Sequence, residues 1–127
     1  MCKSKRFCTS FLLFLLVFLV GQMSHAQVLG EITKIIASDR GFNDEFGIST
    51  DIDGDYAIVG AYRHDQPQGN SSKANAGAAY IYKKDQGGAD NWGELVALRA
   101  ADFDSNDRFG ISVAIHGEYA VVGAHNE

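Results

Sequence analysis

Three carboxylates at alternate positions are the side chains of this chain best suited to hold a metal ion: Asp51, Asp53 and Asp55. Calcium prefers carboxylate oxygens, but it takes about six to eight oxygen ligands. Gly54 is expected to reverse the chain here, so two or three carboxylates at a hairpin tip would be too few. The positions 63 residues later hold Ala114, His116 and Glu118. We therefore expect no metal or other cofactor, and keep the three aspartates as the calcium candidates.

Catalytic motifs are absent from the sequence. Beyond residue 26 the histidines are His64, His116 and His125, and no two stand at the spacing of a metal-binding pair. The sequence contains no Gly-x-Ser-x-Gly, His-Glu-x-x-His or phosphate-binding loop. We therefore expect a protein that is not an enzyme.

A second polar group recurs along the chain. Asp39, Asn43 and Asp44 reappear 63 residues later as Asp102, Asn106 and Asp107. Asp and Asn side chains bond nearby backbone groups in turns, which explains the recurrence. A ligand-binding role is the less favoured alternative.

These recurrences belong to an internal repeat with a period of 63 residues. Residues 29–64 align without a gap on 92–127, with identity at 17 of 36 positions. The densest identities are Phe-Gly-Ile-Ser at 46–49 and 109–112, and Tyr-Ala-x-Val-Gly-Ala at 56–61 and 119–124. A fixed period of this length indicates a repeat architecture. Residues 27–127 hold about 1.6 repeats, so we expect a segment of something larger, truncated at its C-terminal end.

Each copy is predicted to be all-β. Apolar residues, among them Ile48 and Ile52, alternate with polar ones along 46–53, as in a half-buried strand. The next strand, 56–62, is apolar or small on both faces, as in a strand covered on both sides. Further strands are expected at 76–84 and 92–100. The unit is therefore a four-stranded antiparallel meander.

The first copy begins with an extra strand. Residues 28–37 align with the fourth strand of the next unit but lack three predecessors of their own. In a closed ring those three would come from the far C-terminal end, and closure would leave no exposed sheet edges. The pattern therefore favours an incomplete β-propeller over an open solenoid.

The repeat resembles the FG-GAP family, which forms the β-propeller blades of integrin α subunits and of many secreted bacterial proteins. The resemblance covers 29–127, with repeat copies at 29–91 and 92–127. The family's motif elements are matched by Phe46-Gly47, Phe109-Gly110, Gly60-Ala61 and Gly123-Ala124. Two departures stand out: Tyr62 and His125 replace the motif's proline, and a tight turn replaces the nine-residue calcium loop of many members.

The polar loop at 63–75 is the expected binding segment. Long loops on rigid scaffolds commonly carry binding residues. In integrin-like propellers the loops after the second and fourth strands form the ligand face. The resemblance therefore implies that 63–75 shares one face with 39–45 and 102–108. The residues expected to meet a partner are Arg63, His64, Asp65, Asn70, Lys73 and Asn75.

The first 26 residues have the pattern of a secretory signal peptide. Its parts are the basic residues Lys3, Lys5 and Arg6, ten apolar residues at 11–20, and the small residues Ser24 and Ala26 before a cleavage point. The apolar run is shorter than the ~20 residues that a membrane-spanning helix needs. An uncleaved anchor is the alternative. Both cysteines, Cys2 and Cys8, lie in this segment, so the mature chain would form no disulfide.

Charge narrows the choice of partner. Residues 27–127 hold eight Lys and Arg and all sixteen acidic residues, a net charge of −8. Without a basic stripe, nucleic acid is not an expected partner. We predict a secreted or cell-surface FG-GAP β-propeller segment that acts as a non-catalytic binding scaffold for an extracellular protein or glycan. The alternative is a propeller of a larger secreted enzyme, with its active site in later blades or a downstream domain.

Overall fold

The computed structural model describes residues 33–69 and 71–126. The predicted signal peptide at 1–26 and residues 28–32 of the expected first strand lie outside this part. Within it, all regular structure is β and every pair of strands is antiparallel, as the sequence predicted. Across these described residues, no helix has the length and apolar character needed to cross a membrane.

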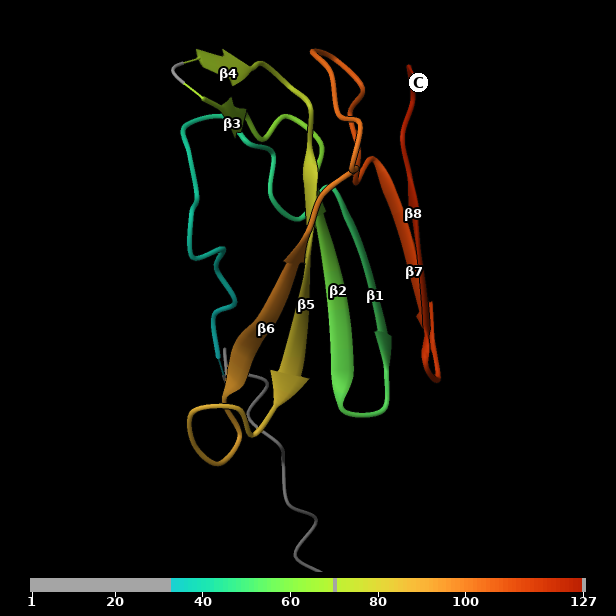
Figure 1. Cartoon of the computed structure of the whole chain (residues 1–127). Helices are drawn as coiled ribbons and strands as arrows, with labels where there is room; N and C mark the ends of the chain where they lie inside the picture. Colours follow the sequence, from blue (N-terminus) through green and yellow to red (C-terminus); the bar gives the residue numbers. More distant parts are fainter. Residues whose placement is uncertain (1–32, 70, 127) are drawn as a thin grey trace, which may run out of the picture. The chain divides into compact units, whose positions relative to one another are not determined.

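A four-stranded sheet forms the first blade, with three strands from the first repeat copy and the fourth from the start of the second (Figure 1). Its strands are β1 (Ser49–Asp53), β2 (Tyr56–Ala61), β5 (Ala78–Lys84) and β6 (Trp92–Leu98). They are hydrogen-bonded in the order β1-β2-β5-β6, so the predicted meander is confirmed. Gly54, with φ of 56°, makes the tight turn between β1 and β2, a conformation that favours glycine.

The second repeat reproduces the first two strands as the hairpin of β7 (Ser112–His116) and β8 (Tyr119–Gly123). Ser112 pairs with Gly123 as Ser49 pairs with Gly60 in the first copy. The repeat seen in the sequence is therefore also a repeat of strand register.

The predicted loop at 63–75 is partly a hairpin. Its centre forms β3 (Gln66–Gln68) and β4 (Ser71–Lys73). Gln66 is almost fully buried and donates from its side-chain amide to the carbonyl of Gly77 at 2.6 Å. This anchor ties the hairpin to the start of β5.

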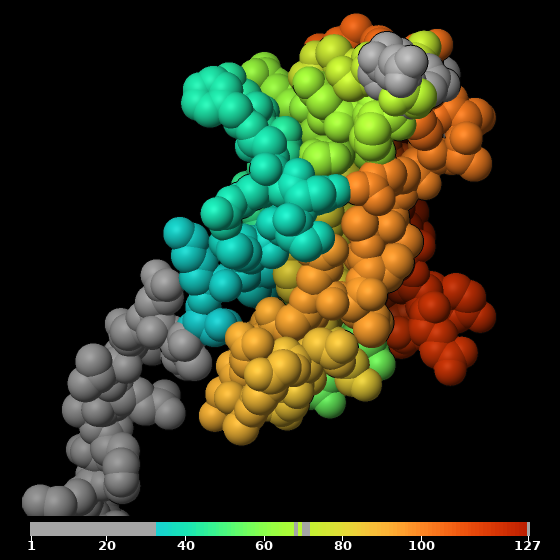
Figure 2. Space-filling model, turned by 60° about the vertical axis from the view of Figure 1, so that its left-hand side comes forward, coloured from blue at the N-terminus to red at the C-terminus, as the bar shows by residue number. Residues whose placement is uncertain are grey.

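One face of the sheet carries the core. Its buried side chains are Ala57, Val59, Ala61, Ala78, Tyr80 and Tyr82. Segment 33–46 covers this face over β5 and β6, with Ala37 buried against the cluster (Figure 2). The ring of Phe46 stands edge-on to Tyr80 and Tyr82, with centroids 5.7 and 6.3 Å apart. The phenylalanine of the first Phe-Gly pair therefore packs into the core of its own blade.

The other face of the sheet meets β7 along β1 and β2. Glycines allow the two backbones to touch: a methyl group on Gly60 would lie 2.0 Å from the carbonyl oxygen of Gly110. Ser49 donates from its hydroxyl to that same carbonyl at 2.8 Å. The backbone N–H of Ile115 donates to Asp51 at 2.8 Å, and that of Gly117 to Asp53 at 2.7 Å. The polar side of β1 is thus the side that binds the next repeat.

Residues 33–37, the described part of the expected strand at 28–37, pair with none of the described strands. The partners of that strand were expected from the far C-terminal end, so it stays a prediction. One expectation from the sequence is wrong, because the apolar side of β1 is not the buried one: Ile48 is 52% exposed and Ile52 61% exposed. The reason is tertiary, since the polar side of β1 faces β7.

Candidate functional site

Three loops gather at one end of the strands, as the resemblance implied (Figure 1). Loop 39–45 meets the 63–75 segment where the N–H of Arg63 donates to the carbonyl of Asp44 at 3.2 Å. The 63–75 segment meets loop 102–108 where the N–H of Asn106 donates to the carbonyl of Ala74 at 2.9 Å. Lys73 and Asp104 add an ion pair at 2.8 Å. The three loops therefore form one continuous polar surface, here called the loop face.

The recurring aspartates shape the loops in the same way in both copies. The Asp44 carboxylate accepts from the N–H of Gly41 at 2.5 Å, and that of Asp107 accepts from the N–H of Asp104, 63 residues further on. Both aspartates are buried. The predicted turn-forming role is therefore confirmed for Asp44 and Asp107.

His64 lies in a polar cluster of the loop face, where it is buried together with Asp44. Its side chain is 7% exposed, with Nδ1 2.9 Å from Asp44 and Nε2 3.6 Å from Asp39. The hydroxyl of Tyr80 donates to Asp39 at 2.8 Å, and the Arg99 guanidinium pairs with the same carboxylate. The expectation that His64 meets a partner is wrong. Two carboxylates hold it inside, where it joins loop 39–45 to the 63–75 segment.

The side chains around His64 have a structural role. Burial and the bond to Asp39 raise the pKa of the Tyr80 hydroxyl well above its usual range, so the hydroxyl stays protonated and keeps donating. The ring of His64 stands edge-on to Tyr80, with centroids 6.3 Å apart. With its ring packed on an aromatic and its nitrogens facing carboxylates, His64 is poorly placed to reach a substrate.

The other described residues that were predicted to contact a partner lie at the surface, but they differ in how strongly bonds to other residues hold their side chains. Asp65 accepts from the N–H of Asn75 at 2.9 Å, and the side-chain amide of Asn75 donates to Asn106 at 3.2 Å. Arg63 is about half exposed; it pairs with Glu45 at 3.3 Å and lies over the ring of Tyr62. Asn70 lies outside the described residues. Of the two predicted cations, Arg63 is thus more accessible than Lys73, whose side chain is 29% exposed.

Phe42 is a surface residue that the sequence analysis did not single out. Its side chain is 94% exposed in loop 39–45, although phenylalanine is usually buried. The equivalent position in the second copy holds Ser105. The sequence did contain a signal for Phe42. A residue with a shared structural role should be similar in both copies, so phenylalanine in one copy and serine in the other indicates that the ring is not needed for the fold.

The calcium candidates do not converge. Asp51 and Asp53 accept from backbone N–H groups of the second repeat, whereas Asp55 lies exposed in the β1–β2 turn. The bonds from the N–H groups of Ile115 and Ile52 hold the pKa of Asp51 below its usual range. Within residues 33–69 and 71–126, no group of three or more metal-ligating side chains comes together.

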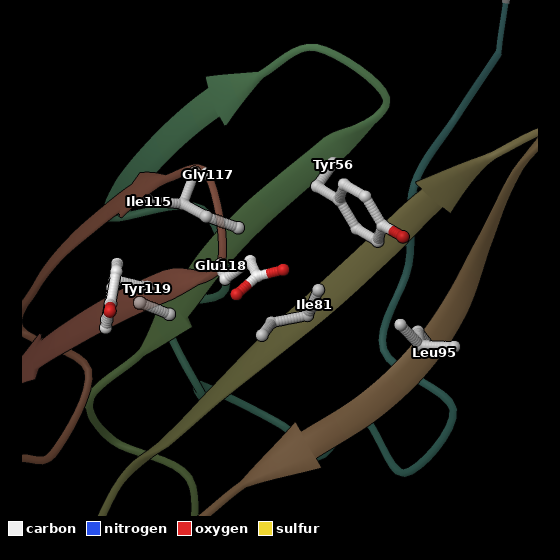
Figure 3. A pocket seen from close by; sticks show the side chains of 8 residues that line it. Tyr56, Ile81, Leu95, Ile115, Gly117, Glu118 and Tyr119 are labelled. Carbon is white, nitrogen blue, oxygen red and sulfur yellow. The ribbon is translucent and has the colours of Figure 1, made fainter.

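An apolar groove of about 230 Å³ separates the β7–β8 hairpin from the outer strands of the first sheet (Figure 3). Its lining includes Tyr56, Ile81, Leu95, Ile115 and Tyr119, with Glu118 supplying the charge. The first blade extends outward through β5 and β6, whereas the described part of the second blade consists of β7 and β8. The groove lies beside this shorter sheet, and it lacks the converging polar groups of a reactive site.

Repeated antiparallel meanders that stack face to face define the class of the protein: a repeat protein built from β-propeller blades. The described residues form one complete blade and the inner hairpin of a second, and they do not close a ring.

The family model for the FG-GAP repeat matches residues 29–82 and 92–127. The chain therefore belongs to the FG-GAP repeat family, as the resemblance implied. Searches of curated proteins and of solved structures found no match to this chain.

Proposed function

We propose that this chain is an exported, non-catalytic FG-GAP segment that binds an extracellular protein or glycan through the loop face. The observation that carries the proposal is the joining of three loops into one surface by backbone bonds and the Lys73–Asp104 ion pair. A surface whose loops are already ordered loses less conformational entropy on binding than free loops would.

Two exposed residues give this surface the chemistry of a binding site. Phe42 offers an uncovered aromatic ring, and Arg63 a half-exposed guanidinium already oriented by Glu45. Aromatic and arginine side chains supply much of the binding energy at protein interfaces, and aromatic rings also stack on sugars. Both lie in or beside loops 39–45 and 63–75, so one partner can contact them together.

Binding to arrays of immobilised glycans and extracellular-matrix proteins tests the proposal. We expect the double variant Phe42→Ala, Arg63→Ala to weaken binding at least about tenfold, which corresponds to about 1.4 kcal/mol. Tyr119→Ala is the matched control, because Tyr119 is 78% exposed and begins β8 beside the β7–β8 turn, which lies at the opposite end of the strands from the loop face (Figure 1). Binding that survives the double variant, or no binding on either array, would contradict the proposal.

Export is tested separately. We expect the chain recovered outside the cytoplasm to begin at Gln27, after the small residues Ser24 and Ala26. N-terminal sequencing of the exported chain checks this. A chain that stays in the cytoplasm, or that keeps residues 1–26 as an anchor, would contradict this part of the proposal.

A further inference from the structure

His64 is a buried side chain of the loop face, and histidine is the residue type that changes charge near neutral pH. Each of its ring nitrogens faces a carboxylate of loop 39–45: Nδ1 lies 2.9 Å from Asp44, and Nε2 lies 3.6 Å from Asp39. A neutral imidazole has one N–H group and one lone pair, whereas the protonated ring has two N–H groups. Only the protonated ring therefore offers a proton to both carboxylates.

Asp44 depends on His64 for a balancing charge. Its carboxylate is buried and also accepts from the neutral N–H of Gly41. In the part of the chain that the structure describes, His64 is the residue whose side chain brings a positive charge within 4 Å of Asp44. Because a buried carboxylate without a counter-charge is costly, loss of the ring proton would leave Asp44 poorly compensated.

The other groups that face the ring do not replace this charge. The Tyr80 hydroxyl, from β5, donates to Asp39, and burial raises its pKa, so it stays neutral where histidine titrates. The Arg99 guanidinium, which follows β6, pairs with Asp39 and keeps its charge at any pH of interest. When His64 is neutral, Asp39 therefore still has a cation beside it, whereas Asp44 has lost its own.

The effect of that loss falls on loop 39–45. The backbone of His64 is held on both sides, since its N–H donates to Ala61 at 3.1 Å and its carbonyl accepts from Gly77 at 2.9 Å. Asp44, by contrast, is joined to the 63–75 segment by the ion pair with His64 and by the bond from the Arg63 N–H to its carbonyl at 3.2 Å. A change of charge on His64 is therefore expected to move the loop rather than the histidine.

The second copy has an equivalent junction without a histidine. The N–H of Asn126 donates to the carbonyl of Asp107 at 3.4 Å, as that of Arg63 donates to Asp44. The next residue is Glu127, which stands at the position equivalent to His64 and cannot carry a positive charge. The repeat therefore does not require histidine here, and its presence gives the first copy a property that the second lacks.

We propose that His64 forms a pH-sensitive link, which fixes loop 39–45 to the 63–75 segment in mildly acidic medium and loosens as the pH rises. The joined loops hold a proton that the separated loops release, so a rise in pH favours separation. The change is expected between about pH 5 and pH 8, where histidine titrates. The link itself needs no partner. Its consequence, tighter binding to the loop face at acidic pH, rests on the proposed function.

Hydrogen exchange of the full chain at pH 6 and pH 8, without any partner, tests the link. After correction for its intrinsic rate, the amide of Arg63 is expected to exchange at least about tenfold faster at pH 8, the effect of losing one hydrogen bond between charged groups. His64→Gln keeps a donor for Asp44 but cannot change charge, so it should remove this pH dependence. His116→Gln is the matched control, because His116 also lies beside a carboxylate, 3.5 Å from Asp53, but is exposed in the β7–β8 turn.

Asp44→Asn provides a second variant in case His64→Gln does not fold. It keeps an acceptor for the N–H of Gly41 and leaves His64 in place, and it should remove most of the change. The proposal is overturned if the corrected rate of the Arg63 amide is the same at both pH values. It is also overturned if the change persists in full in His64→Gln or Asp44→Asn, or is lost in His116→Gln. Because the exchange is measured without a partner, failure of the proposed function would not affect this result.

Discussion

Tyr80 and Tyr82 point to the same side of β5, but their buried hydroxyls differ in their partners. The Tyr80 hydroxyl donates to Asp39, whereas the Tyr82 hydroxyl has no partner in the described part of the chain. We expect Tyr80→Phe to destabilise the fold by about 1–2 kcal/mol, since Asp39 loses a donor. Tyr82→Phe should be neutral or stabilising, because it removes an unpaired polar group. Denaturant unfolding at neutral pH checks the pair, and equal losses in both variants would contradict it.

The same tyrosines predict how stability changes at alkaline pH. Burial raises the pKa of both hydroxyls in the folded state, while in the unfolded chain they ionise near the usual value of 10.0. Above that pH the unfolded state releases protons that the folded state keeps, so the free energy of unfolding should fall as pH rises. Tyr82→Phe should therefore gain stability relative to the parent between pH 9 and pH 11. If the difference in the free energy of unfolding between Tyr82→Phe and the parent is the same at both pH values, the prediction is wrong.

At the scale of the elements, the docking of the β7–β8 hairpin on the first blade should become weaker at low pH. The N–H groups that lower the pKa of Asp51 do so by binding its charged form. This contribution is present above the usual pKa of 3.8 and is lost as pH falls through the lower folded value. We expect the amide of Ile115 to exchange faster at low pH, after correction for its intrinsic rate. Asp51→Asn keeps an acceptor oxygen and should remove the pH dependence. If the corrected exchange rate of the Ile115 amide still changes with pH in that variant, a group other than Asp51 causes the effect and the prediction is wrong.

The contact between the repeats predicts a contrast between two glycines of the Phe-Gly pairs. Gly47 and Gly110 both have positive φ, so alanine strains either one by roughly 1 kcal/mol. Only at Gly110 does the added methyl group also collide with backbone, at the Ala78 carbonyl. Gly110→Ala should therefore cost several kcal/mol and Gly47→Ala about one, measured by unfolding at low protein concentration. Equal effects would mean that the repeats are not packed this closely.

At the scale of the whole molecule, calcium should not stabilise the chain. Asp51 and Asp53 are engaged by the second repeat, and the described residues supply no cluster of ligands beside them. If a calcium site existed, calcium at 100 times its dissociation constant would add about 2.7 kcal/mol to the free energy of unfolding. We expect the melting temperature to be the same in calcium and in chelator. A rise with calcium that Asp53→Ala abolishes would restore the calcium hypothesis.

The sequence by itself determined the repeat unit. Alternation along the strands, glycine at the turns and the 63-residue period are local signals that predicted the all-β class and the order β1-β2-β5-β6, whereas the loop face was implied by the resemblance to integrin-like propellers. The turn-forming role of Asp44 and Asp107 was predictable for the same reason, because each bonds backbone only three residues away.

Only the tertiary structure decided which surfaces are covered. The polar side of β1 is turned inward because β7 supplies an N–H group to Asp51 and the β7–β8 turn supplies one to Asp53. A local pattern cannot pair residues that lie 64 positions apart. His64 was predicted at the surface because its neighbours are polar, but the carboxylates of Asp39 and Asp44 hold it inside. In both cases burial follows from contacts between distant segments, and periodicity along one strand carries no information about them.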